Sequence, residues 1–341
     1  MQKNTCAMFT AAAVVYAGFA LYLYQPYLQN FHRFQYLLIV NLFLASMGCF
    51  LLSRRWVSGF IESLLAGAIY GFGSFTLYLA QDQHHPTASL LAASIPWLFC
   101  PAVFWFKDRQ KWLNILAALL PFLAIVLFFK ITIHLRLFAV STQANLNMKD
   151  LGSLLVPLVA AKQGTILIGF YHVPIAAMIM GFAMITTAKR FGIMSIFALG
   201  IILTFCGPLN SILEVSPIVW LTVSILCCSV IIGIGLQGFV CAGYKDRKWI
   251  LAIAIVMGIL TIVTLLLATK YFQIFLGLGS GYARLLTAEA KMYILGTAAA
   301  ASIFILSYVK LRTHRLREAV LFAAIAFDVF LGARYIIDST F

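Results

Sequence analysis

Three ionisable residues lie inside long apolar segments of this sequence, where a charged side chain needs a specific partner. Asp328 lies within AAIAFDVFLGARY, His172 within GFYHVPIAAM and Glu62 within WVSGFIESLLAG. A charge at the centre of a membrane helix costs about 3 kcal/mol or more, so such residues pair with another group, hold a proton or face a cavity. We therefore expect Asp328, His172 and Glu62 to bind substrate or relay protons.

Each of these residues also has a structural alternative. Asp328 lies too deep to reach the membrane surface, but its carboxyl group could form a hydrogen bond that fixes a neighbouring helix. His172 lies roughly two turns inside its apolar segment, near a backbone carbonyl that Pro174 leaves without a donor. Glu62 lies about one turn from the end of its segment, so its carboxylate could extend to the surface.

Two arginines and a pair of histidines complete the polar candidates. Arg284 follows the glycine run Gly277–Gly281, whose backbone N–H groups could bind an anion. Arg334 lies near the end of the last apolar segment, and we group both arginines with the substrate-binding or proton-relay residues. Adjacent side chains such as His84 and His85 point about 100° apart on a helix and to opposite faces of a strand, so they rarely bind one metal. We predict a helix connection there, with a substrate entrance as the alternative, and no metal site.

Motifs for known catalysis or cofactor binding are missing or lie in the wrong context. The run GIGLQG, Gly233–Gly238, matches a dinucleotide-binding pattern, but no strand precedes it, so we interpret it as a helix-packing site. No G-x-S-x-G nucleophile motif occurs, and the seven cysteines form no CxxC pair. Only His172 is clearly intramembrane and His134 lies at a helix end, so the sequence offers no support for a haem held by two histidines, although such a pair is an open alternative. We predict no cofactor.

The composition excludes an ordinary soluble protein. The chain has 341 residues, of which 63% are hydrophobic and only 10% are charged, and its mean hydropathy is +1.00. Soluble domains carry about 25% charged residues. The net charge of +14 comes from small basic clusters between apolar segments rather than from a continuous basic stripe, which argues against nucleic acid as a partner. The lipid bilayer is the expected environment.

Eleven apolar segments are long enough, at about 20 residues each, to cross the hydrocarbon core as helices. They cover approximately residues 6–24, 36–53, 57–80, 87–106, 112–133, 165–187, 191–213, 217–243, 249–269, 291–309 and 317–337. The predicted fold is therefore an all-α polytopic membrane protein with about 11 transmembrane helices.

The distribution of basic residues predicts the orientation. If the N-terminus is cytoplasmic and the segments alternate, 15 of the 24 Lys and Arg residues fall on the inside, and the short outer loops 81–86 and 214–216 carry none. By the positive-inside rule, we expect a cytoplasmic N-terminus and a C-terminus outside. The chain is predicted to be one membrane unit, with a five-helix front half (1–133), a long outer loop that is interfacial or re-entrant (134–164) and a six-helix back half (165–341).

Residues 56–130 follow a particular order of apolar segments. The glycine-rich segment WVSGFIESLLAGAIYGFGSFTLYLA leads through a short polar turn to the proline-containing segment PTASLLAASIPWLFCPAVFWF, the charged turn KDRQKW and the segment LNILAALLPFLAIVLFF. This stretch resembles half of a drug/metabolite transporter, which implies a helical membrane fold and transport of a small solute. The last segments, with Asp328 and Arg334, are similar to the membrane anchors of molybdenum-type oxidoreductases, which oxidise quinol near the outer face.

We expect a secondary transporter or permease for a small solute, proton-coupled through an intramembrane residue such as Asp328. One alternative is a quinone-interacting or structural subunit of a redox complex, in which a quinone or haem and partner subunits would be present. Another is a membrane enzyme that holds a lipid-linked substrate with the long outer loops 134–164 and 270–290. An enzyme is the less favoured class, and the expected location is a bacterial inner (cytoplasmic) membrane.

Overall fold

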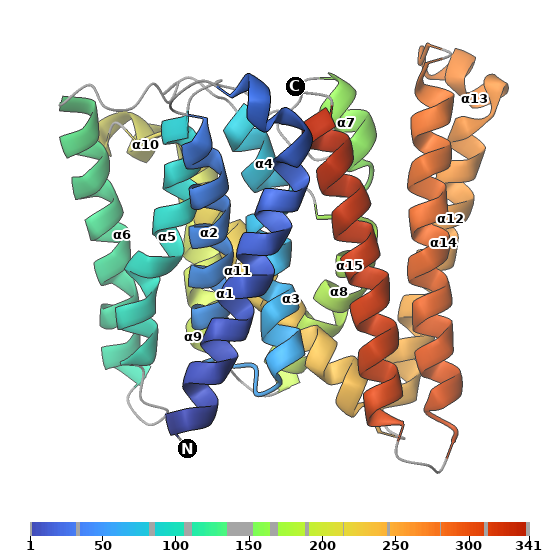
Figure 1. The fold of residues 1–341 in the computed structure, drawn as a ribbon, viewed down its shortest axis with the longest axis horizontal. Coiled ribbons are helices and arrows are strands. Elements are labelled where there is room, and N and C mark those ends of the chain that lie inside the picture. Colours follow the sequence, from blue (N-terminus) through green and yellow to red (C-terminus); the bar gives the residue numbers. More distant parts are fainter. Residues whose placement is uncertain are drawn as a thin grey trace.

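The protein is all-helical, as the sequence predicts. The computed structural model describes residues 2–31, 35–81, 86–105, 111–134, 153–163, 170–187, 191–213, 215–243, 246–279, 281–309 and 313–338. Within these ranges the regular elements are all helices, and no strand occurs. Figure 1 shows the helices gathered into one bundle.

The helices follow one another in the order α1 (Gln2–Tyr24), the 3₁₀ helix η1 (Gln25–Asn30), α2 (Tyr36–Ser53), α3 (Phe60–Gly71), α4 (Ser74–Gln81), α5 (Pro86–Phe104), α6 (Lys111–His134), α7 (Pro157–Gln163), α8 (His172–Thr187), α9 (Phe191–Phe205), α10 (Gly207–Leu213), α11 (Pro217–Cys241), α12 (Arg247–Ala268), α13 (Lys270–Phe275), α14 (Tyr282–Leu306) and α15 (His314–Asp338). Each of the eleven predicted segments overlaps at least one of these helices.

Fewer helices qualify as membrane spans in the structure than the eleven that the sequence predicts. In the described residues, seven helices are long and apolar enough to cross a membrane, or eight if α9 and α10, which are bent by 86° at residue 206, form one span. Three other predicted segments correspond to the shorter apolar helices Ser89–Phe104, Leu116–Phe128 and His172–Thr186. Several long apolar helices are compatible with an integral membrane protein, while the count of eleven spans stays a prediction.

Two predicted boundaries are wrong. The outer loop expected at 270–290 contains α13 and the first turns of α14, because the charges of Arg284, Glu289 and Lys291 lower the hydropathy of a segment that is nevertheless helical. His172, expected about two turns inside a helix, is instead the first residue of α8. Pro174 explains this start, because proline fits the first turn of a helix and disrupts its interior.

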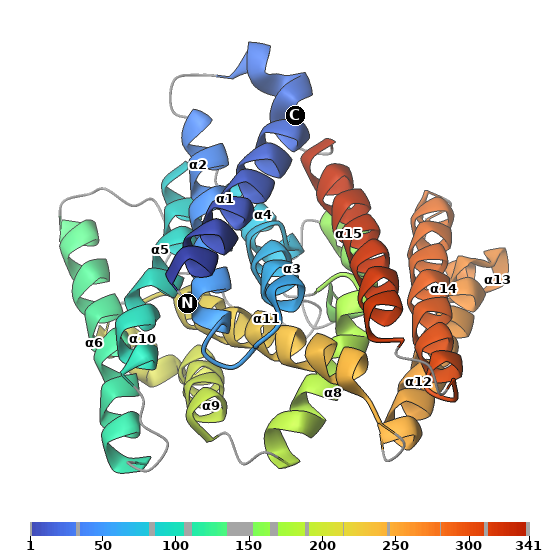
Figure 2. The ribbon, with the colours of Figure 1, turned by 60° about the horizontal axis from the view of Figure 1, so that its bottom comes forward.

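Helix α11 forms the centre of the bundle. Every residue from 218 to 240 except Gln237 is buried, and α11 contacts α2, α3, α5, α8, α9 and α15. Figure 2 shows it crossing the molecule beneath α1 and α3. A helix that is covered on all sides can be apolar on all sides, which explains why its sequence lacks a polar face.

Glycines of the Gly233–Gly238 run allow the close approach of neighbouring helices, as the packing interpretation requires. A Cβ atom on Gly235 would collide with the carbonyl oxygen of Ala177 on α8, and one on Gly181 would collide with the carbonyl oxygen of Ile231 on α11. The backbones of α8 and α11 therefore touch through small residues, a common arrangement between membrane helices.

The outer faces of α6 and α12 carry large apolar side chains that none of the other described helices covers. The exposed residues are Trp112, Leu113, Leu116, Leu120, Leu123 and Leu127 on α6, and Trp249, Leu251, Ile255, Ile259 and Ile262 on α12. A monomeric soluble protein rarely exposes apolar patches of this extent to water. Lipid is the environment that accommodates such faces.

Several arginines lie at helix ends on one side of the bundle. Helices α1, α12 and α15 begin at this end, and α2 ends there (Figure 1). Helix α15 ends at the opposite side of the bundle. The residues at these helix ends include Arg54, Arg55, Arg247, Arg315 and Arg317. We call this the basic end of the bundle.

The contact between α8 and α11 generates a stability prediction. Gly235→Ala should lower the free energy of unfolding by about 1–3 kcal/mol, because the added methyl group overpacks a contact with backbone atoms that cannot move aside. Gly258→Ala on α12 is the matched control, since its added Cβ meets only Thr297 Cγ2, at 4.0 Å. This control should be neutral or stabilising by up to about 1 kcal/mol, as alanine favours helix. Thermal unfolding in detergent compares the two, and equal effects would contradict the close contact.

Candidate functional site

His172, Glu289 and Asp328 form a buried network that joins three helices. The Nδ1 atom of His172, on α8, lies 3.1 Å from Oδ1 of Asp328, on α15, and its Nε2 atom is hydrogen-bonded to Oε2 of Glu289, on α14. The side chain of His172 is 1% exposed, and those of Glu289 and Asp328 are 0% exposed. One imidazole ring therefore bridges two carboxyl groups away from water.

Backbone N–H groups at the starts of two short helices complete the network. Oε1 of Glu289 accepts hydrogen bonds from Leu158 N at 2.6 Å and Val159 N at 3.2 Å, in the first turn of α7. Oδ2 of Asp328 accepts from Val173 N at 2.7 Å, in the first turn of α8. These donors have no partner within their own helices. Both carboxyl groups and both ring nitrogens are thus fully partnered.

The two hydrogen bonds of the His172 ring require one more proton than the network would hold with a neutral His172 and two ionised carboxylates. A neutral imidazole has one N–H donor, whereas both ring nitrogens of His172 face a carboxyl oxygen. The second hydrogen bond needs a proton either on the ring or on a carboxyl group. Because the three groups are coupled, this proton belongs to the network as a whole.

Tyrosine side chains hold the surrounding elements in place. The ring of Tyr293, one turn after Glu289 on α14, packs edge-on against His172 with 4.7 Å between ring centroids, and its hydroxyl donates to Leu155 O at 2.6 Å. The hydroxyl of Tyr171 donates to Phe72 O at 2.9 Å, at the break between α3 and α4. The carbonyl of Phe72 lies at this break in the helix, and the hydroxyl of Tyr171, the residue before His172, provides its hydrogen bond.

The structure brings two of the predicted site residues together and leaves three apart. Asp328 and His172 are partners in the network. Glu62 lies in the first turn of α3, is 3% exposed, and its Oε2 atom has no hydrogen-bond partner in the described part of the chain. Arg284 is exposed near the start of α14. Arg334 is 47% exposed and pairs with Asp338 at 3.5 Å, four residues along α15.

Sequence reasoning did not place Glu289 in the site. The residue falls within the outer loop predicted at 270–290, where an acidic side chain would face water and need no buried partner. The signal that identifies it is periodicity: Leu285, Leu286, Glu289 and Tyr293 are all buried and recur at helical spacing. An acidic residue on the apolar stripe of a helix points to a buried partner.

No metal site accompanies the network in the part of the chain that the structure describes. No group of three or more His, Cys, Asp and Glu side chains within these residues is arranged to hold a metal ion. In the network the ring of His172 separates the two carboxyl groups, so the three side chains do not converge on one point. His84 and His85 lie outside the described residues.

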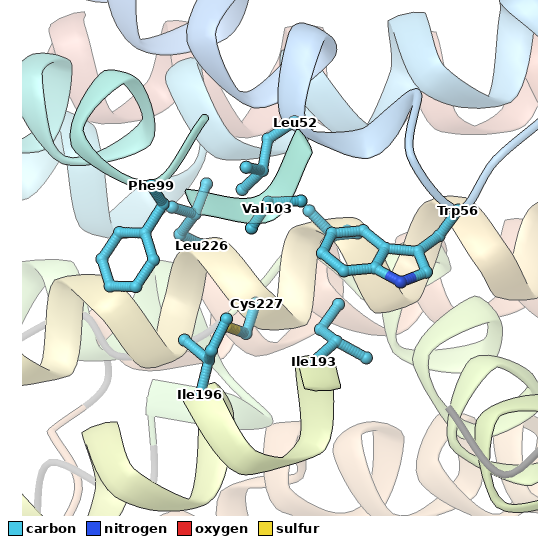
Figure 3. Close-up of a pocket in the computed structure, with 9 residues that line it drawn as sticks. Leu52, Trp56, Phe99, Val103, Ile193, Ile196, Leu226 and Cys227 are labelled. Carbon is cyan, nitrogen blue, oxygen red and sulfur yellow. The ribbon is translucent and has the colours of Figure 1, made fainter. Parts of the chain in front are cut away.

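Two apolar cavities lie elsewhere in the bundle. The first, between α2, α5, α9 and α11, is lined by side chains that include Leu52, Trp56, Phe99 and Cys227 (Figure 3). It contains no acid–base pair and carries no evident chemistry. The second lies between α8, α11, α14 and α15, and Val173 of the network forms part of its wall.

The buried network is suited to holding a proton rather than to acting on a bound substrate. A histidine flanked by carboxylates can serve as a general base, but it must then reach the atom from which it takes a proton. Here all the polar atoms of the three side chains are already occupied by one another or by the backbone. A change in protonation would alter helix contacts directly.

Comparison with known proteins provides no relative from which a role could be transferred. No protein-family model, curated protein or solved structure matches this chain. The geometry of its own residues is therefore the basis for assigning a function.

Proposed function

We propose that this protein is a proton-coupled secondary transporter for a small solute, with His172, Glu289 and Asp328 as its proton-binding site. The observation that carries the proposal is the closed network itself. It is buried, it needs one additional proton, and it holds together α7, α8, α14 and α15. Intramembrane ionisable groups of this kind are typical of proton pathways.

Loss of the shared proton provides a coupling mechanism. Without it, His172 can donate to only one of Glu289 and Asp328, and the other carboxylate faces a ring nitrogen that also lacks a hydrogen. An uncompensated buried charge destabilises a structure by about 3–5 kcal/mol, which is enough to shift an equilibrium between two arrangements of packed helices. Either α14 or α15 would then separate from α8 and admit water.

Discontinuous helices support the same function. Helices α7 and α8 supply their first-turn N–H groups to the network, and α3 and α4 break next to Tyr171. Transporters place such half-helices around their binding sites, because non-helical backbone inside a membrane is tolerated where other protein groups satisfy it. The resemblance of residues 56–130 to half of a drug/metabolite transporter, which stays a prediction from the sequence, points to the same class of protein.

We further propose eleven spans, a cytoplasmic N-terminus, a C-terminus outside, and a location in a bacterial inner membrane. The basic end of the bundle would face the cytoplasm by the positive-inside rule. A solute that enters from outside would then approach the network from the side of the bundle on which α15 ends.

The orientation can be tested with fused reporters. A reporter that is active only in the cytoplasm should be silent when fused after Phe341 of the full chain, because the C-terminus lies outside. The same reporter fused after Arg55, which follows α2, should be active and serves as the control. Activity at both positions would refute the proposed orientation.

Asp328→Asn tests the proton-binding site. The amide oxygen can still accept from Val173 N, and the amide N–H can donate to Nδ1 of a neutral His172, so the network closes without the additional proton. We expect the variant to fold, to lose transport driven by an imposed pH gradient, and to keep a thermal stability that no longer depends on the network proton.

The parent protein should behave differently as the pH rises. Its folded state holds a proton that the unfolded chain releases near neutral pH, so its stability should fall as pH increases through the range in which the network deprotonates. Thermal unfolding across pH, together with solute uptake into vesicles, distinguishes the two proteins. If Asp328→Asn and the parent showed the same dependence of thermal stability on pH and the same solute uptake, the network would have only a structural role.

A further inference from the structure

Glu62 is a buried acidic residue that the network does not use. It is 3% exposed, and its Oε2 atom has no hydrogen-bond partner among the described residues. Within the described part of the chain, no Lys, Arg or His forms an ion pair with it. A carboxylate buried without a counterion costs more free energy than a neutral carboxyl group in the same position.

The backbone at the start of α3 leaves room for this carboxyl group. A Cβ atom on Gly59 would occupy the position of Oε2 of Glu62, so the glycine allows the carboxyl group to lie over the chain just before the helix. The guanidinium of Arg54 lies nearby, but it donates to the carbonyl oxygens of Ser58 and Gly59, at 2.9 Å each. Arg54 therefore fixes the α2–α3 connection and leaves Oε2 of Glu62 without a donor.

Titratable groups on three neighbouring elements face Glu62. They are Glu318 and His314 on α15, Cys241 at the end of α11, and Arg54 at the end of α2. A negative charge on Glu62 is repelled by Glu318 and attracted by Arg54 without a direct contact. The other titratable side chains that α1, α2 and α15 bring to this region donate to backbone carbonyl groups; they are Tyr16, Cys49 and Arg317.

The site lies where α3, α11 and α15 meet at the basic end of the bundle. Each of these three helices contacts the other two. Glu318 precedes Asp328 by ten residues on α15, which corresponds to roughly 15 Å along the helix. Glu62 and the network are therefore separate sites that both adjoin α15.

We propose that Glu62 is a second proton-binding residue, and that its protonated form keeps α3 and α15 closed against each other at the basic end. This inference rests on the proposed function and adds to it a proton site on the cytoplasmic side. When the carboxyl group ionises, its proton leaves to water and no other bond changes. The resulting carboxylate is buried beside Glu318, and it gains hydration only if α3 and α15 separate.

Infrared spectroscopy of the purified full chain in ester-free detergent detects the proton directly. A protonated carboxyl group has a C=O band that a carboxylate lacks, and an ordinary glutamate, with a pKa of about 4.3, is ionised at about pH 7. At that pH, we expect the parent to show a carboxylic acid band that Glu62→Gln loses. Asp328→Asn is the matched control and should retain this band, because it changes only the network.

Glu318→Gln tests the same proton without changing Glu62. The band should disappear in this variant at a lower pH than in the parent, because the like charge that opposes ionisation of Glu62 is removed. The measurement is an infrared titration of both proteins. An unchanged titration would contradict the placement of Glu318 against Glu62.

Hydrogen exchange tests the closure of the basic end. At one alkaline pH, amides of residues 60–66 and 314–321 should exchange about tenfold faster in the parent than in Glu62→Gln, because an uncompensated buried charge favours opening. At acidic pH, where Glu62 is protonated, the two proteins should exchange equally. Residues 220–232 of the central helix α11 are the internal control and should not differ.

The outcomes separate this inference from the function on which it rests. A carboxylic acid spectrum that Glu62→Gln leaves unchanged, or equal exchange of the two proteins at alkaline pH, would overturn the role of Glu62. The network would still stand if the parent shows the pH-dependent stability that Asp328→Asn lacks. If Glu62 behaves as expected while Asp328→Asn and the parent share one pH dependence, Glu62 is a proton site and the proposed function of the network is wrong.

Discussion

The imidazole of His172, held between two buried carboxyl groups, is the interaction on which the surrounding structure depends. Its partners lie 117 and 156 residues away in the sequence, so a single ring closes contacts among α8, α14 and α15. Three ionisable groups are removed from water here, and the energetic cost is offset only because every polar atom has a partner. Because every polar atom is partnered, loss of one proton leaves one of these hydrogen bonds without a hydrogen.

The helices α7 and α8 provide hydrogen-bond donors that the three side chains of the network lack. The first-turn N–H groups of α7 and α8 supply hydrogen bonds to Glu289 and Asp328, whose negative charge is favoured near helix N-termini. These interruptions of the helical backbone are stable because α11 and its neighbours bury them. The irregular backbone and the buried charges therefore stabilise each other.

Helix α15 is hydrogen-bonded to other elements near both of its ends and at Asp328 between them. Asp328 binds α8 within the bundle, and the guanidinium of Arg317 donates to Ala242 O at 2.8 Å and Leu306 O at 3.1 Å near the basic end. The apolar cavity lies between these two positions, and Leu321 of α15 contributes to its wall. At the opposite end of α15, the hydroxyl of Tyr27 on η1 donates to Oδ1 of Asp338 at 2.7 Å.

The sequence by itself determined the all-helical class, the apolar segments and two of the three network residues. These follow from local quantities: the length of an apolar run, and the cost of a charge such as Asp328 within it. The tertiary structure alone decided that His172 starts a half-helix, that Glu289 belongs to a helix rather than a loop, and that Arg284 and Arg334 lie outside the network. Hydropathy averages over neighbouring residues, so it cannot separate a polar loop from a helix with a buried acid. The pairing of His172 with Glu289 and Asp328 depends on how α8, α14 and α15 pack against one another, and no local pattern encodes that arrangement.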